Sequence, residues 1–192
     1  VVVFAIAPYA WMVLTSIRPD ADLSTFPLSY MPSQVTLEHY VTLLQQTSFL
    51  QNLFNSLVIA AGAVVVGLVT SVPAAYAFSR FRFRGRQVLM TQFLVINMFP
   101  VVLLIIPLFV LMRNFHLLDT YFGIIIGHST FAIPFAVWML TSYMNGIPRE
   151  VDEAAMMDGA SRLQTIRLVI LPLLMPGIVT TAIYIFVTSR NA

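Results

Sequence analysis

Residues 153–159 are Glu-Ala-Ala-Met-Met-Asp-Gly, and residues 169–172 are Val-Ile-Leu-Pro. Long apolar segments surround this region in a chain of 192 residues, of which 59% are hydrophobic and only 9% are charged. Soluble domains average about 45–50% apolar and about 25% charged residues. Because so few charges cannot solvate the surface of a soluble fold, the composition predicts an all-α protein that crosses a membrane several times.

Polar segments divide the apolar chain into five hydrophobic stretches. A membrane-spanning helix needs about 20 apolar residues. We expect a truncated first helix at 1–17 and spanning helices at 52–78, 87–112, 121–143 and 168–188. Residues 18–51 are predicted to be an extramembrane loop with a short helix near 37–45. The third span is interrupted by Pro100 and Pro107, and the proline pairs 100/107 and 172/176 are expected to mark kinks.

The distribution of arginine predicts the orientation of these spans. Alternation places loops 79–87 and 145–167 on one side, where they hold seven arginines: Arg80, Arg82, Arg84, Arg86, Arg149, Arg162 and Arg167. The other side holds Arg18, Arg113 and Arg190. Because cytoplasmic loops carry the excess of basic residues, the first pair is predicted to be cytoplasmic. The run 80–86 is explained by topology and contact with membrane lipids, with a role at a partner as the alternative.

The 145–167 loop has the signals of a short amphipathic helix. Pro148 suits the first turn, where its missing N–H is not needed. Glu150, Asp152 and Glu153 cluster near the same N-terminus, where the helix dipole favours anions. We expect these acids to be solvated and not to act as acid–base catalysts.

The same loop is predicted to turn a corner and continue into the last span. Gly159 is placed to end the first helix in a left-handed conformation. Ser161 and Gln164 have the spacing of a capping box for a second helix. The loop contains no catalytic, metal-binding or phosphate-binding motif. Docking to a partner and a simple interfacial loop both fit these signals.

The order Glu-Ala-Ala, three residues, Gly, nine residues, an aliphatic residue, one residue, Leu-Pro resembles a known signature. It is similar to the cytoplasmic loop of inner-membrane permeases in binding-protein-dependent ABC importers, with Val169 where Ile is common. Residues 76–85, Tyr-Ala-Phe-Ser-Arg-Phe-Arg-Phe-Arg-Gly, resemble the first cytoplasmic loop of the carbohydrate-uptake branch. That branch includes the second permease of maltose-type importers.

The resemblance implies a type I ABC importer permease fold with six spans, of which about five are present here. It implies a multi-pass protein of a bacterial or archaeal cytoplasmic membrane. Its expected partners are a cytoplasmic ABC ATPase dimer, a second homologous permease and an extracytoplasmic solute-binding protein. No cofactor is expected in this chain, since the ATPase would bind and hydrolyse ATP with Mg²⁺. Nucleic acid is not expected as a partner, because the formal net charge is only +2.

In such a permease the 145–167 loop would dock on the ATPase and couple its closure to alternating access. The resemblance assigns this docking and coupling role to Glu153, Ala154, Ala155, Asp158, Gly159, Leu171 and Pro172. Polar residues within the spans are candidates for the substrate path: Gln92, Asn97, Ser129, Thr130 and Tyr184, with His128 and the aromatic Phe99, Phe131 and Tyr76 as further candidates. Hydrogen bonding between or within helices is the competing explanation for these polar residues.

A sugar or oligosaccharide is the cargo that the resemblance favours. A polyol, glycerol phosphate or a peptide is the alternative within ABC importers. An ion-coupled secondary transporter would need acidic or lysine residues inside its spans, and the expected spans contain none. A non-transporting scaffold would not explain the spacing of residues 153–172.

Overall fold

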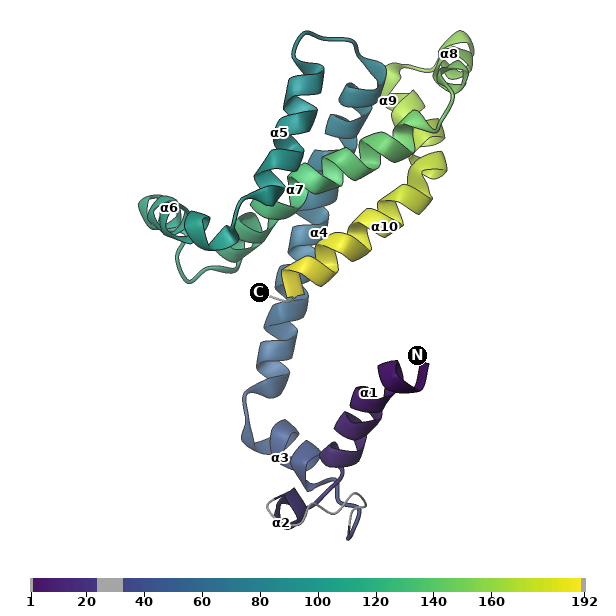
Figure 1. The fold of residues 1–192 in the computed structure, drawn as a ribbon. Coiled ribbons are helices and arrows are strands. Elements are labelled where there is room, and N and C mark those ends of the chain that lie inside the picture. The colour runs from purple at the N-terminus through teal and green to yellow at the C-terminus, as the bar shows by residue number, and fades with distance from the viewer. Residues whose placement is uncertain (1, 24–32, 191–192) are drawn as a thin grey trace. The chain divides into compact units, whose positions relative to one another are not determined.

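The computed structural model describes residues 2–23 and 33–190, and all regular structure in these ranges is helical. The chain forms two compact units, residues 1–55 and residues 56–192. Figure 1 labels the helices, and each unit is described by itself.

Within residues 2–23 and 33–55, the first unit contains α1 (Val2–Ser16), α2 (Asp20–Leu23), α3 (Glu38–Gln46) and the start of α4 (Phe49–Arg80). Helix α1 is apolar, and 15 of its residues lie within the described part of the chain. Helix α3 confirms the short helix predicted near 37–45. Residues 24–32 of the predicted 18–51 loop lie outside the described residues.

Side-chain contacts join the segments of this unit. The Tyr40 hydroxyl donates to Ser16 Oγ at 2.7 Å, and the guanidinium of Arg18 lies 5.2 Å from the centroid of the Trp11 ring. The backbone N–H of Ser33 donates to the Asp22 carboxylate at 2.7 Å. This bond and a second one from the Ser33 hydroxyl lower the pKa of Asp22 below its usual value.

The second unit contains most of α4 and the remaining helices: α5 (Arg86–Met98), α6 (Val101–Asn114), α7 (Tyr121–Asn145), α8 (Arg149–Met157), α9 (Arg162–Thr165), the π-helical η1 (Ile166–Ile170) and α10 (Leu171–Arg190). Among the described residues, three helices are long and apolar enough to cross a membrane: α4, α7 and the continuous helix of α9, η1 and α10. They contain the predicted segments 52–78, 121–143 and 168–188.

The predicted third span, residues 87–112, differs from the single helix that was expected. It is divided into α5 and α6, which are bent by 103° relative to each other. Phe99 is extended, with φ −70° and ψ 134°. A residue before proline avoids the helical conformation, and Pro100 supplies no N–H to continue the helix. Pro107 lies inside α6 without ending it. The part of the chain that the structure describes therefore has a fourth candidate span only if this bent pair counts as one.

Small residues allow the long helices of this unit to approach closely. Gly62 and Gly67 of α4 lie against Ile125 of α7 and Ile185 of α10, because an added Cβ would come within 2.4 Å and 2.7 Å of these side chains. Ala63 is fully buried in the same region. Close packing of this kind stabilises helix pairs in lipid, where burial of apolar surface supplies little driving force.

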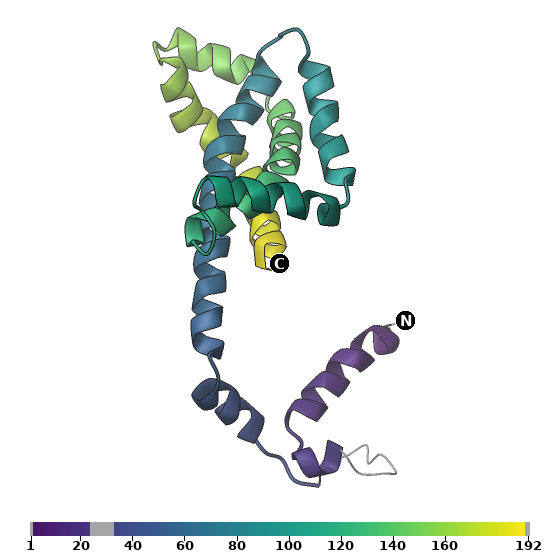
Figure 2. The same ribbon diagram turned by 90° about the vertical axis from the view of Figure 1, so that its left-hand side faces the viewer.

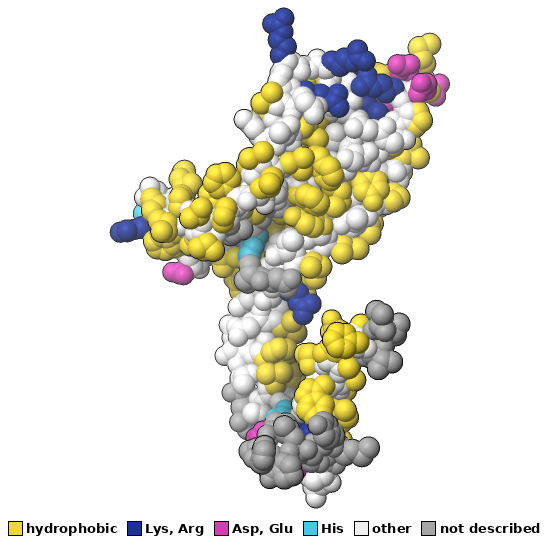
Figure 3. Space-filling view, viewed as in Figure 1, with side chains coloured by type: hydrophobic (Ala, Val, Ile, Leu, Met, Phe, Trp, Pro, Cys, Tyr) yellow, Lys and Arg dark blue, Asp and Glu magenta, His cyan; other side chains and the backbone are white. Residues whose placement is uncertain are grey.

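One end of the second unit gathers the two loops that were predicted to share a side of the membrane. Both ribbon views place α8, α9 and the turn between α4 and α5 at this end (Figures 1 and 2). Figure 3 shows basic side chains concentrated there, with acidic side chains over α8. This common location agrees with the predicted alternation of the spans. That this end of the unit faces the cytoplasm stays a prediction.

Candidate functional site

Helix α8 begins at Arg149, so that Pro148, predicted for the first turn, lies immediately before it. Pro148 is its N-cap residue, with φ −57° and ψ 144°, and Glu150 and Asp152 lie in the first turn. Glu153 and Ala154 are exposed, Ala155 is half-buried, and the side chain of Met157 is 88% exposed. The outer face of α8 therefore presents an acid beside small and flexible apolar side chains, a combination suited to contact with another protein.

A left-handed residue makes the corner after α8. Gly159 has φ +87°, and its N–H donates to the carbonyl of Met156 at 3.1 Å. The N–H of Ala160 donates to the carbonyl of Ala155 at 3.0 Å. These two bonds form a Schellman motif, which satisfies carbonyls that the helix end leaves open. The predicted role of Gly159 as the corner residue is confirmed.

The capping box that starts the second arm is also confirmed. The Ser161 hydroxyl accepts from the N–H of Gln164 at 3.4 Å, and the Gln164 side chain accepts from the N–H of Ser161 at 2.8 Å. Helix α9 then continues through η1 into α10, where Leu171 is half-buried and Pro172 is exposed. Pro172 has no N–H to donate to the carbonyl of Leu168, and in an α-helix the proline ring would crowd that carbonyl. The wider turn of the π-helical η1 relieves this contact.

Asp152 corrects the expectation that all three acids of α8 are solvated. Its side chain is only 7% exposed, and its Oδ2 lies 2.8 Å from Nη2 of Arg80. The Tyr76 hydroxyl donates to Asp152 Oδ1 at 3.4 Å. A buried carboxylate needs such a partner, because desolvation disfavours an isolated charge. Of the three acids, Glu150 and Glu153 are the exposed ones.

Arg80 was predicted to set topology or contact lipid, and the structure gives it a different place from Arg82 and Arg84. Its side chain is only 8% exposed, whereas Arg82 and Arg84 are exposed. Sequence reasoning missed the pair with Asp152. The available signal was that alternation placed opposite charges in loops on the same side, but nothing in the sequence selected these two residues.

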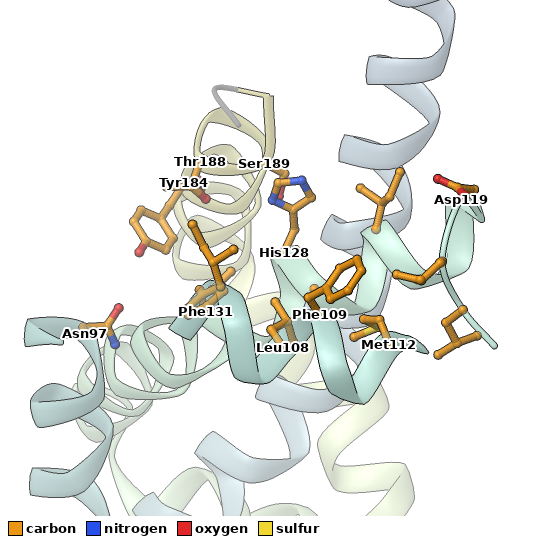
Figure 4. A pocket seen from close by; sticks show the side chains of 17 residues that line it. Asn97, Leu108, Phe109, Met112, Asp119, His128, Phe131, Tyr184, Thr188 and Ser189 are labelled. Carbon is orange, nitrogen blue, oxygen red and sulfur yellow. Dashed lines mark hydrogen bonds between the residues drawn. The ribbon is translucent and has the colours of Figure 1, made fainter. Parts of the chain in front are cut away.

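The candidate residues for a substrate path fall into two groups. A cavity of about 670 Å³ lies between α5, α6, α7 and α10. Asn97, His128, Phe131 and Tyr184 line it, together with Phe109, Thr188 and Ser189, which were not predicted (Figure 4). Gln92, Ser129, Thr130, Phe99 and Tyr76 are outside this lining set.

Hydrogen bonds within single helices explain part of the second group. The hydroxyls of Ser129 and Thr130 donate to the carbonyls of Ile125 and Ile126, at 2.7 Å and 2.8 Å. This back-bonding to residue i−4 is common for hydroxyl side chains in helices. Asn97 also bonds its own helix, through Phe93 O at 2.9 Å, although it lines the cavity.

The comparison with known protein families covers both cytoplasmic loops predicted from the sequence. The model of the family described as "Binding-protein-dependent transport system inner membrane component" matches residues 63–192. The chain belongs to this family. It is therefore an inner-membrane component of a binding-protein-dependent transport system, and its fold is that of an ABC importer permease.

Individual members of the family match nearly the whole chain. The trehalose transport system permease protein SugB of Mycobacterium tuberculosis is 37% identical over 191 residues, which cover 100% of this chain and 69% of that protein. The trehalose/maltose transport system permease protein MalG of Thermococcus litoralis is 34% identical over 191 residues, covering 98% and 68%. The chain thus spans about two thirds of the length of these permeases.

A solved structure of a permease has the same fold. The crystal structure of a bacterial ABC transporter involved in the import of the acidic polysaccharide alginate contains a chain that matches with a TM-score of 0.85 and 29% identity. The match covers 98% of this chain and 66% of that chain. It supports the type I importer fold that the spacing of residues 153–172 suggested.

Proposed function

We propose that this chain is a permease subunit of an ATP-driven importer for a sugar or oligosaccharide. It forms half of the transmembrane path and couples ATPase closure to alternating access. The observation that carries the proposal is the helix–corner–helix loop of α8, Gly159 and α9 in a member of the permease family. The chemistry of ATP and Mg²⁺ belongs to a separate ATPase in this proposal.

The outer face of α8 is the docking surface for that ATPase. Glu153 makes the polar contact, Ala154 and Ala155 permit close approach, and Gly159 fixes the corner. Asp158 caps the C-terminus of α8, with its N–H donating to the carbonyl of Ala154 at 3.0 Å. Leu171 and Pro172 begin the membrane helix that follows. The second homologous permease and the solute-binding protein complete the importer.

The cavity supports a sugar as cargo. Phe109, Phe131 and Tyr184 offer aromatic faces, and His128 and Thr188 offer hydrogen-bonding groups. Ser189 is buried, and its hydroxyl has no hydrogen-bond partner within residues 2–23 and 33–190. A mixture of apolar walls and a few polar groups is typical of small-molecule sites. The names of the relatives, which include trehalose and maltose permeases, favour the same class.

Uptake by the reconstituted importer tests this function. The full-length protein with its ATPase, paired permease and binding protein is placed in proteoliposomes, and uptake of labelled trehalose and maltose is measured. We expect uptake to require ATP and to persist when ionophores collapse the ion gradients. Uptake that needs no ATP and stops with the ionophores would instead establish ion-coupled transport.

Reversing the charge of Glu153 is expected to weaken assembly. Glu153→Lys should weaken binding of the ATPase at least about tenfold and so lower the amount that co-purifies, since like charges across an interface cost several kcal/mol and each 1.4 kcal/mol is a factor of ten in the dissociation constant. Glu153→Gln should have a smaller effect. Glu38→Lys, which reverses an exposed acid of α3, is the matched control. Co-purification of Glu153→Lys at the control level would remove Glu153 from the interface.

A further inference from the structure

Two adjacent acids of α8 have opposite environments. Glu153 is exposed, whereas Asp152 is buried against Arg80, the last residue of α4. We propose that Arg80 and Asp152 form the mechanical link that transmits displacement of α8 to the membrane helix α4. Both are positioning residues, and the proposal rests on the coupling function proposed above.

The guanidinium of Arg80 contacts more than the carboxylate. Its Nη1 and Nη2 both donate to the carbonyl of Ile147 at 3.1 Å, and Nη1 lies 3.5 Å from the carbonyl of Met144. Met144 is near the end of α7, and Ile147 is in the connection to α8. One side chain at the end of α4 therefore holds the end of α7, the connection and α8 together. A planar fork of five donors makes arginine suited to this task.

The residues beside Arg80 add further contacts from both arms of the loop. Arg149 Nη2 donates to the carbonyl of Ser79 at 2.9 Å, and the Ser79 hydroxyl donates to Asn145 Oδ1 at 2.8 Å. The guanidinium of Arg162 lies 5.3 Å from the centroid of the Phe81 ring. The segment 79–81 at the end of α4 is thus contacted from α7, α8 and α9.

The site is screened from water. Tyr76, Leu140, Met144 and Ile170 form a buried apolar cluster, against which Ile147 and Val151 pack. The attraction between opposite charges is stronger in such apolar surroundings than in water. Separating Arg80 from Asp152 would leave two charges unpaired there, and removing one partner of a buried pair is strongly destabilising. The pair therefore resists separation, as a loop that moves in both directions during the proposed transport cycle requires.

The two acids should therefore fail in different ways. Altering Glu153 removes a contact with the ATPase and lowers assembly. Altering the Arg80–Asp152 pair leaves the outer face of α8 intact, so assembly and ATP hydrolysis persist. The number of solute molecules imported per ATP then falls, because α8 moves without taking α4 with it.

A paired apolar replacement separates this role from simple stabilisation. Arg80→Met combined with Asp152→Leu replaces both charged groups by apolar side chains, so no unpaired charge is left buried. The full-length variant is assembled into the importer, and ATP hydrolysis and solute uptake are measured in the same proteoliposomes. We expect solute imported per ATP to fall about fivefold, within the range by which residues between two sites alter their coupling.

Arg82→Met, an exposed neighbour of the pair, is the control and should keep the wild-type ratio. A wild-type ratio in the paired variant would overturn the proposal, because the pair would then serve stability alone. If the paired variant does not assemble, Arg80→Lys decides: it keeps the charge but loses the planar fork. A lowered ratio supports the link, and a wild-type ratio overturns it. The wild-type importer is measured in the same assay. If it imports solute and the variants match its ratio, the link between α8 and α4 is wrong; if the wild type itself shows no ATP-driven uptake, the proposed function is wrong.

Discussion

Gly159→Val is expected to leave the importer assembled but to reduce ATP-driven uptake by about 5- to 30-fold, because the left-handed conformation costs an L-residue about 1–2 kcal/mol and a β-branched one at least as much. The φ of Gly159 is +87°, a region that glycine enters freely. Valine would favour a different turn after α8. The exposed face of α8 would then meet the ATPase at the wrong angle to the membrane helix that follows.

The effect should follow backbone preference and not side-chain size. A Cβ added at Gly159 would meet no atom within 4 Å, so there is open space for a side chain. Gly159→Asn, which introduces a larger side chain than alanine but tolerates the left-handed region, should retain most uptake. Gly159→Ala should be intermediate. Backbone strain rises in these three variants from asparagine to alanine to valine, whereas side-chain volume rises from alanine to asparagine to valine.

Uptake and ATP hydrolysis measured together in proteoliposomes check this series. Wild-type values of both in Gly159→Val would show that the corner does not need its left-handed residue. Equal losses in the valine and asparagine variants would instead point to a steric contact with the ATPase. The order valine, alanine, asparagine in increasing uptake is the result that supports a strained corner.

The sequence was most informative where the structural cause is local. Gly159 and the Ser161–Gln164 capping box act within six residues, and each has a well-defined backbone requirement. Close helix approach in lipid also has a local cause, because it is governed by side-chain size at a few positions such as Gly62 and Gly67 of α4.

Features that depend on distant parts of the chain could not be read in this way. Arg80 and Asp152 are 72 positions apart, and only the packing of α4 against α7 and α8 brings them together. The sharp bend after Met98 was also underestimated. Proline in a membrane helix can lie within a continuous helix, as Pro107 does in α6, or mark a break, as at Pro100. Tertiary contacts decide between these outcomes.

The cavity shows the same limit for polar residues. Ser129 and Tyr184 both looked suitable for a substrate path, but Ser129 bonds its own helix while Tyr184 lines the cavity. Helix rotation determines this difference. A polar residue in an apolar span indicates that a partner is needed, but the backbone of its own helix is often that partner.

Arg80→Ala is expected to destabilise the purified protein by about 3–5 kcal/mol, which is the usual effect of removing one member of a buried ion pair. The carboxylate of Asp152, only 7% exposed, would lose its partner, and the carbonyl of Ile147 would lose both donors from Arg80. Arg82→Ala removes the same charge two residues later from an exposed position. It should change stability by less than about 0.5 kcal/mol.

Thermal unfolding of the full-length protein in detergent measures the difference. At about 2–4 °C per kcal/mol, the sensitivity of a chain of roughly 150–250 residues, the expected loss corresponds to a fall in the melting temperature of about 6–20 °C. Arg80→Ala combined with Asp152→Ala should recover part of it, since the second substitution removes the unpaired charge. If Arg80→Ala and Arg82→Ala have the same melting temperature, the carboxylate of Asp152 is solvated in the protein and cannot hold α8 to α4. Stability thus tests the buried geometry on which the proposed link depends, without requiring transport to be measured.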